Sequence, residues 1–222
     1  MSALKLPEAL KYLALSREGL SISFNYRASL VSASPIIKHR IHQLLMLLGF
    51  RRSVPSHLRD ILLAPGPPQT LNELVRWARN PKTRLSSCYL TFCSPSAVLV
   101  VERDLGKASC RISTRHLVCT NHDVDMESLT HEERVWLLRE HGFDGGVVND
   151  IVEDSVERKD VLVRLLRTSA AGRTMGDVKT WLEQEPVRNE STHFSCIMDP
   201  SVEGGGLAWV QRYPGADVDY VA

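Results

Sequence analysis

Hydrophobic and polar residues alternate from Leu20 to Tyr26, which is the period of a half-buried β-strand. Farther along, Ser34-Pro35 has the residues that favour a helix start, and Gly49 is a residue typical of a helix end. Between these two points the apolar residues recur at helical spacing, at Ile37, Ile41, Leu44, Leu45 and Leu48. The pattern therefore predicts a strand followed by a helix.

Two more helices are predicted before the pattern changes. A short helix is expected at about 56–63, and the Pro/Gly-rich stretch 64–69 is expected to be a loop. Thr70 and Glu73 have the spacing of a capping box. We therefore expect a helix from Thr70 to Arg79, where Asn80-Pro81 would end it.

The next stretch is rich in residues that favour strands. Four short runs separated by turn residues predict an antiparallel meander, at Cys88–Cys93, Ala97–Glu102, Ala108–Ile112 and His116–Thr120. Helices are then predicted from Thr130, over about 154–167 and from Thr174, and strands follow at 193–198 and 207–212. This order predicts an α+β fold with helices layered on antiparallel sheet, not βαβ winding.

Composition narrows the class of protein. The chain has 222 residues, 43% hydrophobic and 24% charged, which is typical of a single globular domain. Its net charge of +1 favours neither nucleic-acid binding nor a general attraction to anionic membranes. The longest apolar run, Leu44 to Phe50, is too short for a transmembrane segment. The first thirty residues contain no signal peptide, so the sequence as written predicts a cytoplasmic location.

General motifs for chemistry are absent. We find no phosphate-binding loop, dinucleotide fingerprint, serine-hydrolase elbow or zinc-protease motif, so no cofactor is expected. The five cysteines form no CxxC pair, so no metal site is expected; Cys110 and Cys119 are expected to be small buried residues. Basic residues at 38–40 and 51–52 could contact phosphate, although a solvated helix face is the commoner role of such residues.

Two short segments differ from their surroundings. Asn25-Tyr26-Arg27 ends the first predicted strand, and Thr120-Asn121-His122-Asp123 ends the fourth β-rich run. Asparagine often begins a turn, but two strand-end amides could also donate N–H groups to one oxyanion. His122 beside Asp123 suggests a base and its orienting group, but neighbours on a strand point to opposite faces. Arg158 is in line with Leu162 and Leu165 on its helix, where an arginine commonly extends its stem over apolar surface.

Several segments, taken in their order, resemble the acid ceramidase and N-acylethanolamine acid amidase family. The family belongs to the N-terminal nucleophile hydrolase superfamily, which includes the choloylglycine hydrolases. The resemblance covers residues 19–212 and is carried by Ser21–Arg27, Cys88–Cys93, Val101–Asp104, Val118–Asp123 and Asp154–Arg158. No single segment is decisive, whereas the ordered series is distinctive.

The resemblance implies an αββα sandwich, in which two antiparallel sheets lie between helical layers. It also implies hydrolysis of a fatty-acyl amide, such as a ceramide or an N-acylethanolamine. In that family, self-cleavage exposes a cysteine whose α-amino group is the base for its own thiol. Residues 1–222 would form a single domain of this kind, with 1–18 only weakly assigned.

The resemblance carries site roles to three residues of this chain. Asn121 matches the asparagine on the oxyanion side, Asn25 matches a second active-site amide, and Arg158 matches an arginine that holds the charged site together. Arg134 competes with Arg158, because it lies at a similar distance beyond Asn121. The distance onward to the 193–198 strand favours Arg158 and makes 124–152 an insertion.

One departure from the family matters for function. The family's nucleophilic cysteine lies well upstream of Asn25, and the 24 residues that precede Asn25 here contain no cysteine. We therefore expect an amidase that lacks its N-terminal portion, acts only with an upstream nucleophile segment, and associates with that segment or with itself through an exposed sheet edge. The alternatives are an inactive remnant that binds a ligand or partner, and a small cytosolic protein with structural cysteines. Some relatives would be lysosomal or secreted.

Overall fold

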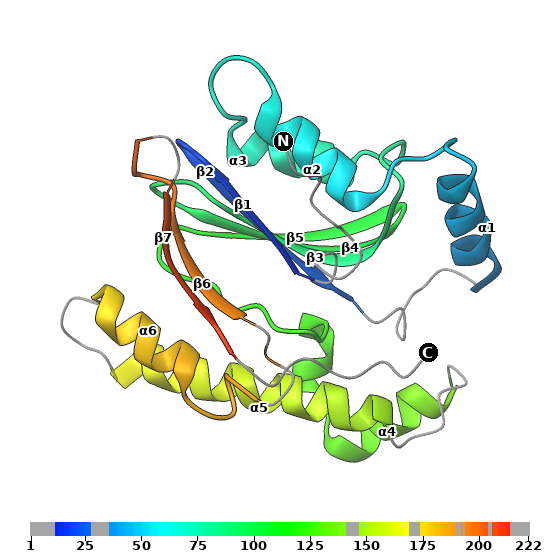
Figure 1. The fold of residues 1–222 in the computed structure, drawn as a ribbon. Helices are drawn as coiled ribbons and strands as arrows, with labels where there is room; N and C mark the ends of the chain where they lie inside the picture. The colour runs from blue at the N-terminus through cyan, green and yellow to red at the C-terminus, as the bar shows by residue number, and fades with distance from the viewer. Residues whose placement is uncertain are drawn as a thin grey trace.

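The computed structural model describes residues 12–27, 36–140, 147–168, 174–189, 192, 194–203 and 206–213. Within these residues the protein is a mixed α+β fold with a five-stranded antiparallel sheet, a two-stranded hairpin and six α-helices (Figure 1). The α+β prediction is confirmed. The helices are α1 (Ile36–Leu47), α2 (Val54–Leu63), α3 (Leu71–Arg79), α4 (His131–Glu140), α5 (Val147–Thr168) and α6 (Met175–Glu183).

The large sheet has the order β1-β2-β3-β4-β5, and each strand is antiparallel to its neighbour. Its strands are β1 (Tyr12–Arg17), β2 (Leu20–Tyr26), β3 (Leu85–Cys93), β4 (Val98–Leu105) and β5 (Lys107–Ser113). The small sheet pairs β6 (Phe194–Asp199) with β7 (Gly206–Arg212). The predicted strands at 20–26 and in the first three β-rich runs are confirmed, as are the two strands of the tail.

Two parts of the sheet differ from the prediction. β1 lies in residues to which the sequence assigned no element; it pairs with β2 through a turn at Gly19, whose φ of +80° suits glycine. The fourth β-rich run, His116–Thr120, is wrong as a strand, because the chain leaves the sheet after β5. Its end, Thr120–Asp123, bonds instead to side chains of other elements, which replaces the hydrogen bonds of a strand ladder.

One face of the large sheet is apolar and is covered by α2 and α3 (Figure 1). Alternate residues of β2, β3 and β4 point toward these helices, among them Ile22, Leu90 and Leu99. They form the core together with Leu58 of α2 and Leu74 of α3. The predicted capping box at Thr70 is present at the start of α3, and the predicted helix start at Thr174 has a capping box with Asp177 at the start of α6. The capping residues found in the sequence therefore stand where α3 and α6 begin in the structure.

The opposite face of the large sheet is turned toward the rest of the chain. The hairpin β6–β7 lies on this side, and α5 and α6 lie beyond it (Figure 1). The Gly19 N–H donates to the Pro200 carbonyl at 2.8 Å and joins the β1–β2 turn to the loop after β6. A 3₁₀ helix, η2 (Val124–Ser128), and α4 occupy most of the stretch expected to be an insertion, and α5 begins within it, at Val147.

Helix α1 packs with an unexpected side toward the sheet. The recurring apolar residues Ile37, Ile41, Leu44 and Leu48 are exposed, although such a stripe usually faces a core. The inner side carries His39, which lies 3.3 Å from Asp104, and the buried His42. The predicted helix start at Ser34-Pro35 lies outside the described residues, while Gly49 has the expected positive φ of +77°. No helix in the described ranges is long and apolar enough to span a bilayer.

Arg103 of β4 ties the sheet to the C-terminal end of α3. Its side chain is fully buried and donates to three backbone carbonyls, those of Ala78, Thr83 and Leu105. A cation at the C-terminus of a helix also interacts favourably with the helix dipole. This one side chain therefore fixes how α3 sits on the apolar face.

We expect Arg103→Met to lower the free energy of unfolding by about 3 kcal/mol or more, because it leaves buried carbonyls without donors at about 1–3 kcal/mol each. Urea titration followed by circular dichroism measures the change. Arg76→Met, at an exposed position of α3, is the matched control and should change stability by no more than about 0.5 kcal/mol. Equal effects of the two substitutions would contradict the structural role of Arg103.

Candidate active site on the polar face of the sheet

The face of the large sheet that points away from α2 and α3 carries polar and ionisable side chains. The strand register places Asn25 of β2 opposite Tyr89 of β3, and Tyr89 opposite Glu102 of β4. Residues directly opposite each other on neighbouring strands point to the same face. Three functional groups therefore form a row across the sheet.

A buried ion pair stands beside this row. Arg27, one residue after β2, donates from Nε to Asp123 Oδ1 at 2.6 Å, and its Nη2 bonds to Asp123 Oδ2. Tyr89 donates its hydroxyl to the same carboxylate at 2.7 Å. Arg27, Asp123 and Tyr89 are all more than 90% buried. The ion pair joins residues that are 96 positions apart in the sequence.

Burial and charge change the ionisation of this group. Burial works against the charge of Arg27, but the hydrogen bond and charge of Asp123 outweigh it, so the pKa of Arg27 is raised. Burial, followed by the charge of Asp123, raises the pKa of Tyr89, which therefore stays a hydroxyl donor. Burial also raises the pKa of Glu102, whereas Arg111, whose Nη2 lies 2.8 Å from Glu102 Oε1, opposes that rise. The cluster is a set of charged and polar groups held in fixed positions in a buried environment of low dielectric constant.

A second set of hydrogen bonds holds Asn121 and His122. The Asn121 backbone N–H donates to Ser155 Oγ of α5 at 2.6 Å, and Ser155 Oγ lies 2.9 Å from His122 Nδ1. Thr120 Oγ1 lies 3.1 Å from the same nitrogen. Burial, with the positive charge of Lys159, lowers the pKa of His122. The imidazole is therefore neutral and positions the loop, and Ser155, which is fully buried, cannot meet a substrate.

The structure brings the two asparagine segments to one side of the sheet. Asn25 is half-buried on β2 next to Tyr89, and Tyr89 bonds to Asp123, two residues after Asn121. The two segments are therefore joined through Tyr89 and Asp123. His122 and Asp123 turn to different partners and do not form a base with its orienting group.

The two candidate arginines occupy different environments. Arg158 lies on α5 and donates from Nε to the Asp154 carbonyl at 3.2 Å, a bond within its own helix. Arg134 lies on α4, donates to the Leu129 carbonyl at 2.7 Å, and is among the charges that act on His122. The Nε of Arg134 is buried and has no hydrogen-bond partner. Arg134 is thus one of the charges that lower the pKa of His122, next to Asn121, whereas no such effect is seen for Arg158.

None of the five cysteines has an activated thiol. Burial raises the pKa of each thiol, to about 12 for Cys88 and to about 11 for Cys119, and also at Cys93, Cys110 and Cys196. The thiolate is the nucleophilic form of cysteine, so a raised pKa makes these side chains poor nucleophiles. Cys110 and Cys119 are half-buried, less enclosed than expected for core residues.

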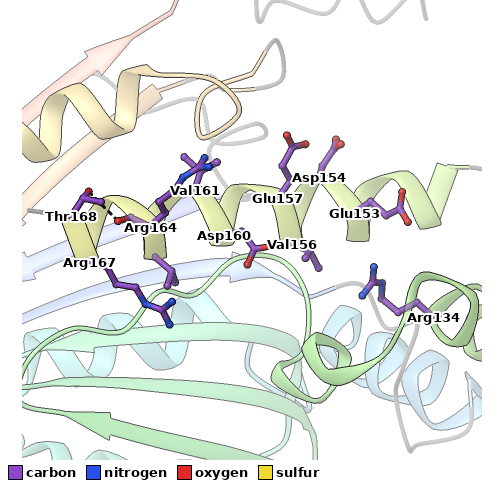
Figure 2. A pocket seen from close by; sticks show the side chains of 11 residues that line it. Arg134, Glu153, Asp154, Val156, Glu157, Asp160, Val161, Arg164, Arg167 and Thr168 are labelled. Atoms are coloured by element: carbon purple, nitrogen blue, oxygen red, sulfur yellow. Dashed lines mark hydrogen bonds between the residues drawn. The ribbon is translucent and has the colours of Figure 1, made fainter.

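A pocket of about 1000 Å³ lies elsewhere, along α5 (Figure 2). Figure 2 shows acidic and basic side chains of α5 around it, with Arg134 approaching from α4. Most of its charged lining residues are exposed, including Asp154, Glu157, Asp160 and Arg164. A site for a fatty-acyl chain needs mainly apolar walls, so this pocket does not match that chemistry. Within the described ranges, no cluster of His, Cys, Asp and Glu is placed to hold a metal ion.

The sequence marks both segments as unusual but does not predict that Arg27 and Asp123 join them. A usable signal was present: Arg27 is the only charged residue between Glu18 and Lys38, and a lone charge at the end of a buried strand usually needs a partner. Tyr89 and Ser155 carried no comparable signal, because their roles depend on long-range contacts.

We expect Asp123→Asn to lower the free energy of unfolding by about 3–5 kcal/mol, because it leaves the buried Arg27 guanidinium without its counter-charge. Chemical denaturation measures the loss, and Asp125→Asn, at an exposed position two residues later, is the control. The double variant Arg27→Met/Asp123→Leu should be more stable than Asp123→Asn. An Asp123→Asn protein as stable as the control would show that the ion pair contributes little.

Stability should also fall in acid because of buried histidines. Burial lowers the pKa of His42 to about 4 and also lowers the pKa of His57 and His122. The unfolded chain takes up protons near pH 6.5, so the folded state is favoured above that pH and loses stability as the pH falls from 6.5 toward 4. Thermal unfolding across this range measures the slope. His42→Gln should flatten the slope, and an unchanged slope would contradict the role of His42.

Comparison of the chain with protein-family models, with curated proteins and with solved structures finds no match. The contacts around Arg27, Tyr89, Asp123 and Asn121 are therefore the basis for any functional conclusion, together with the ordered sequence segments that resemble the amidase family.

Proposed function

We propose that this protein carries the oxyanion-binding part of an N-acyl amide hydrolase site, with a fatty-acyl amide as substrate. The supporting observation is the Arg27–Asp123 ion pair, which joins the Asn25-Tyr26-Arg27 and Thr120–Asp123 segments across 96 positions. These are the same segments whose asparagines correspond to active-site amides in the acid ceramidase family. A buried ion pair that brings both together on one sheet face fits a common site.

The chemistry follows from the groups on this face. A thiolate attacks the amide carbonyl carbon, and the developing oxyanion accepts hydrogen bonds from the amides of Asn25 and Asn121. The tetrahedral intermediate then expels the amine, which takes up a proton, and leaves a thioester that water hydrolyses. Because burial raises the pKa of all five thiols, the attacking thiol would come from a segment outside residues 1–222.

The fold that accompanies this proposal is the αββα sandwich. Its support is the arrangement of α2 and α3 on one face of the large sheet, with β6–β7, α5 and α6 on the other side (Figure 1). In this proposal the nucleophile segment adds strands at an edge of a sheet, where unpaired N–H and C=O groups are available. The nucleophile would then stand beside the polar face that carries Asn25 and Tyr89.

Both arginines remain candidates for the charged position of the proposed site. Arg158 has the spacing that the resemblance favours, whereas Arg134 is the one whose charge acts on His122, next to Asn121. The two roles differ in their kinetic effect. An arginine that holds the Asn121 loop would lower kcat when removed, whereas a solvated arginine on α5 would leave kcat unchanged.

A second function follows if no upstream segment supplies a nucleophile. The polar face with its buried ion pair would then bind a ligand or partner without turnover. The raised pKa of all five thiols fits this function as well as the first, so the upstream segment is what separates the two. Removing the nucleophile from a hydrolase typically costs about a millionfold in rate, so the two functions are easily separated.

The test compares two proteins, residues 1–222 alone and the chain extended upstream to include a Cys-Thr or Cys-Ser pair. We expect no hydrolysis of fluorogenic N-acyl amides by the first and thiol-dependent hydrolysis by the second. In the active form, Asn121→Ala should lower kcat by about 10²–10³-fold, as loss of one oxyanion donor does. Asn72→Ala, at an exposed position of α3, is the control and should be silent.

Two results would contradict the proposal. The first is amidase activity of residues 1–222 that is abolished by changing one of the five cysteines. The second is an active extended protein that is indifferent to Asn121→Ala. Arg134→Ala and Arg158→Ala are assayed in the same active form, and the variant with the larger loss of kcat identifies the arginine of the site.

A further inference from the structure

Helix α1 turns its apolar stripe outward, away from the sheet. Ile37, Ile41, Leu44 and Leu48 recur at helical spacing, and each is exposed by between 49% and 59%. Leu47 and Phe50 extend this surface and are 85% and 77% exposed. We call these six side chains the α1 stripe. A surface helix in a globular protein normally buries such a stripe.

The inner side of α1 explains why the helix is held this way round. His42 is buried and lies 3.0 Å from Arg51 Nη1, and His39 lies 3.3 Å from Asp104. Ser86 of β3 donates to Met46 Sδ at 3.8 Å. The contacts of His39 and Met46 attach the helix to β4 and β3 by its less apolar side. These contacts therefore set the outward direction of the α1 stripe.

Basic side chains flank the α1 stripe on both sides. With 3.6 residues per turn, Lys38 and Arg40 fall on opposite sides of the line through Ile37, Ile41 and Leu44, and both are exposed. Of the other basic residues near α1, Arg51 bonds to His42 and Arg52 pairs with Asp60, so Lys38 and Arg40 are the cations that stand beside the stripe.

An apolar stripe between rows of cations fits the surface of an anionic bilayer. A helix of this kind lies in the plane of the interface, with apolar side chains about 5–10 Å below the headgroups. Lysine and arginine at its edges extend to the anionic headgroups while their stems stay in the apolar region. Figure 1 shows α1 at one end of the molecule, apart from the other helices.

A second copy of the chain fits this surface less well. In a two-fold dimer the same patch meets itself, so Lys38 and Arg40 of one copy would face the same cations of the other. Asp60, the next acidic residue along the chain, is already paired with Arg52. A twelve-residue helix is also only about 18 Å long, which is short for an interface of the size that stable dimers need.

We propose that α1 is a membrane-docking helix that inserts the α1 stripe into the surface of an anionic lipid bilayer. This inference does not depend on the proposed amidase site, since none of its residues belongs to the Arg27–Asp123 cluster. It sets a geometric condition for the rest of the molecule: the end of the sheet that carries α1 faces the lipid.

The test is cosedimentation of the 222-residue chain with phosphatidylcholine vesicles, with and without phosphatidylserine. We expect binding to the anionic vesicles that weakens as salt is added. Leu44→Ser/Leu48→Ser should weaken it at least about tenfold, because each buried leucine contributes about that much. Lys38→Gln/Arg40→Gln should weaken binding to anionic vesicles by about tenfold or more and leave any binding to neutral vesicles unchanged.

Matched controls separate this effect from general stickiness and general charge. Leu207→Ser/Val210→Ser removes equally exposed apolar residues from β7, and Arg164→Gln/Arg167→Gln removes exposed cations from α5; neither should change vesicle binding. Circular dichroism confirms that the variants are folded, and the lipid and salt dependence of the unchanged chain is independent of any variant. Binding that ignores phosphatidylserine, or that all variants share, overturns the proposal. So does a dimer in solution that Leu44→Ser/Leu48→Ser dissociates.

Discussion

The buried ion pair between Arg27 and Asp123 is the interaction on which the polar side of this molecule depends. Two opposite charges withdrawn from water are stable only when geometry and hydrogen bonding are both satisfied, and here Tyr89 supplies a further donor to the carboxylate. The requirement fixes the end of β2 against the loop at 120–123. Asn121, two residues before Asp123, is held near this face by its backbone N–H, which donates to Ser155 Oγ.

The large sheet divides the protein into two chemical environments. Its apolar face buries a continuous core under α2 and α3, with Arg103 fixing the end of α3. Its other face is polar and partly enclosed, which strengthens electrostatic interactions there. A reactive centre needs polar groups in a partly enclosed environment, held in place by a rigid core. At the proposed site the polar face of the strands carries the functional groups, and the apolar face of the same strands provides the rigid core.

Helix α1 also has a polar and an apolar side, but here the polar side faces the protein and the apolar side faces outward. Its histidines and Met46 face the protein, whereas Ile37, Ile41, Leu44 and Leu47 face outward, so this apolar surface is available to something other than the core. If α1 lies on a lipid surface, a protein that hydrolyses fatty-acyl amides would work beside its substrate. The docking helix and the proposed site are separate in structure, and each can be present without the other.

The sequence by itself determined the local elements and the fold class. Capping boxes at Thr70 and Thr174 and the alternation in β2, β3 and β4 depend on neighbours within a few residues, so the α+β order could be predicted. It also predicted Asn25 and Asn121 as candidate site residues. Only the tertiary structure decided the pairing of β1, the path of residues 116–120, the outward face of α1 and the joining of Arg27 to Asp123. These features depend on contacts between residues far apart in the chain, whose burial and charge compensation no local pattern records.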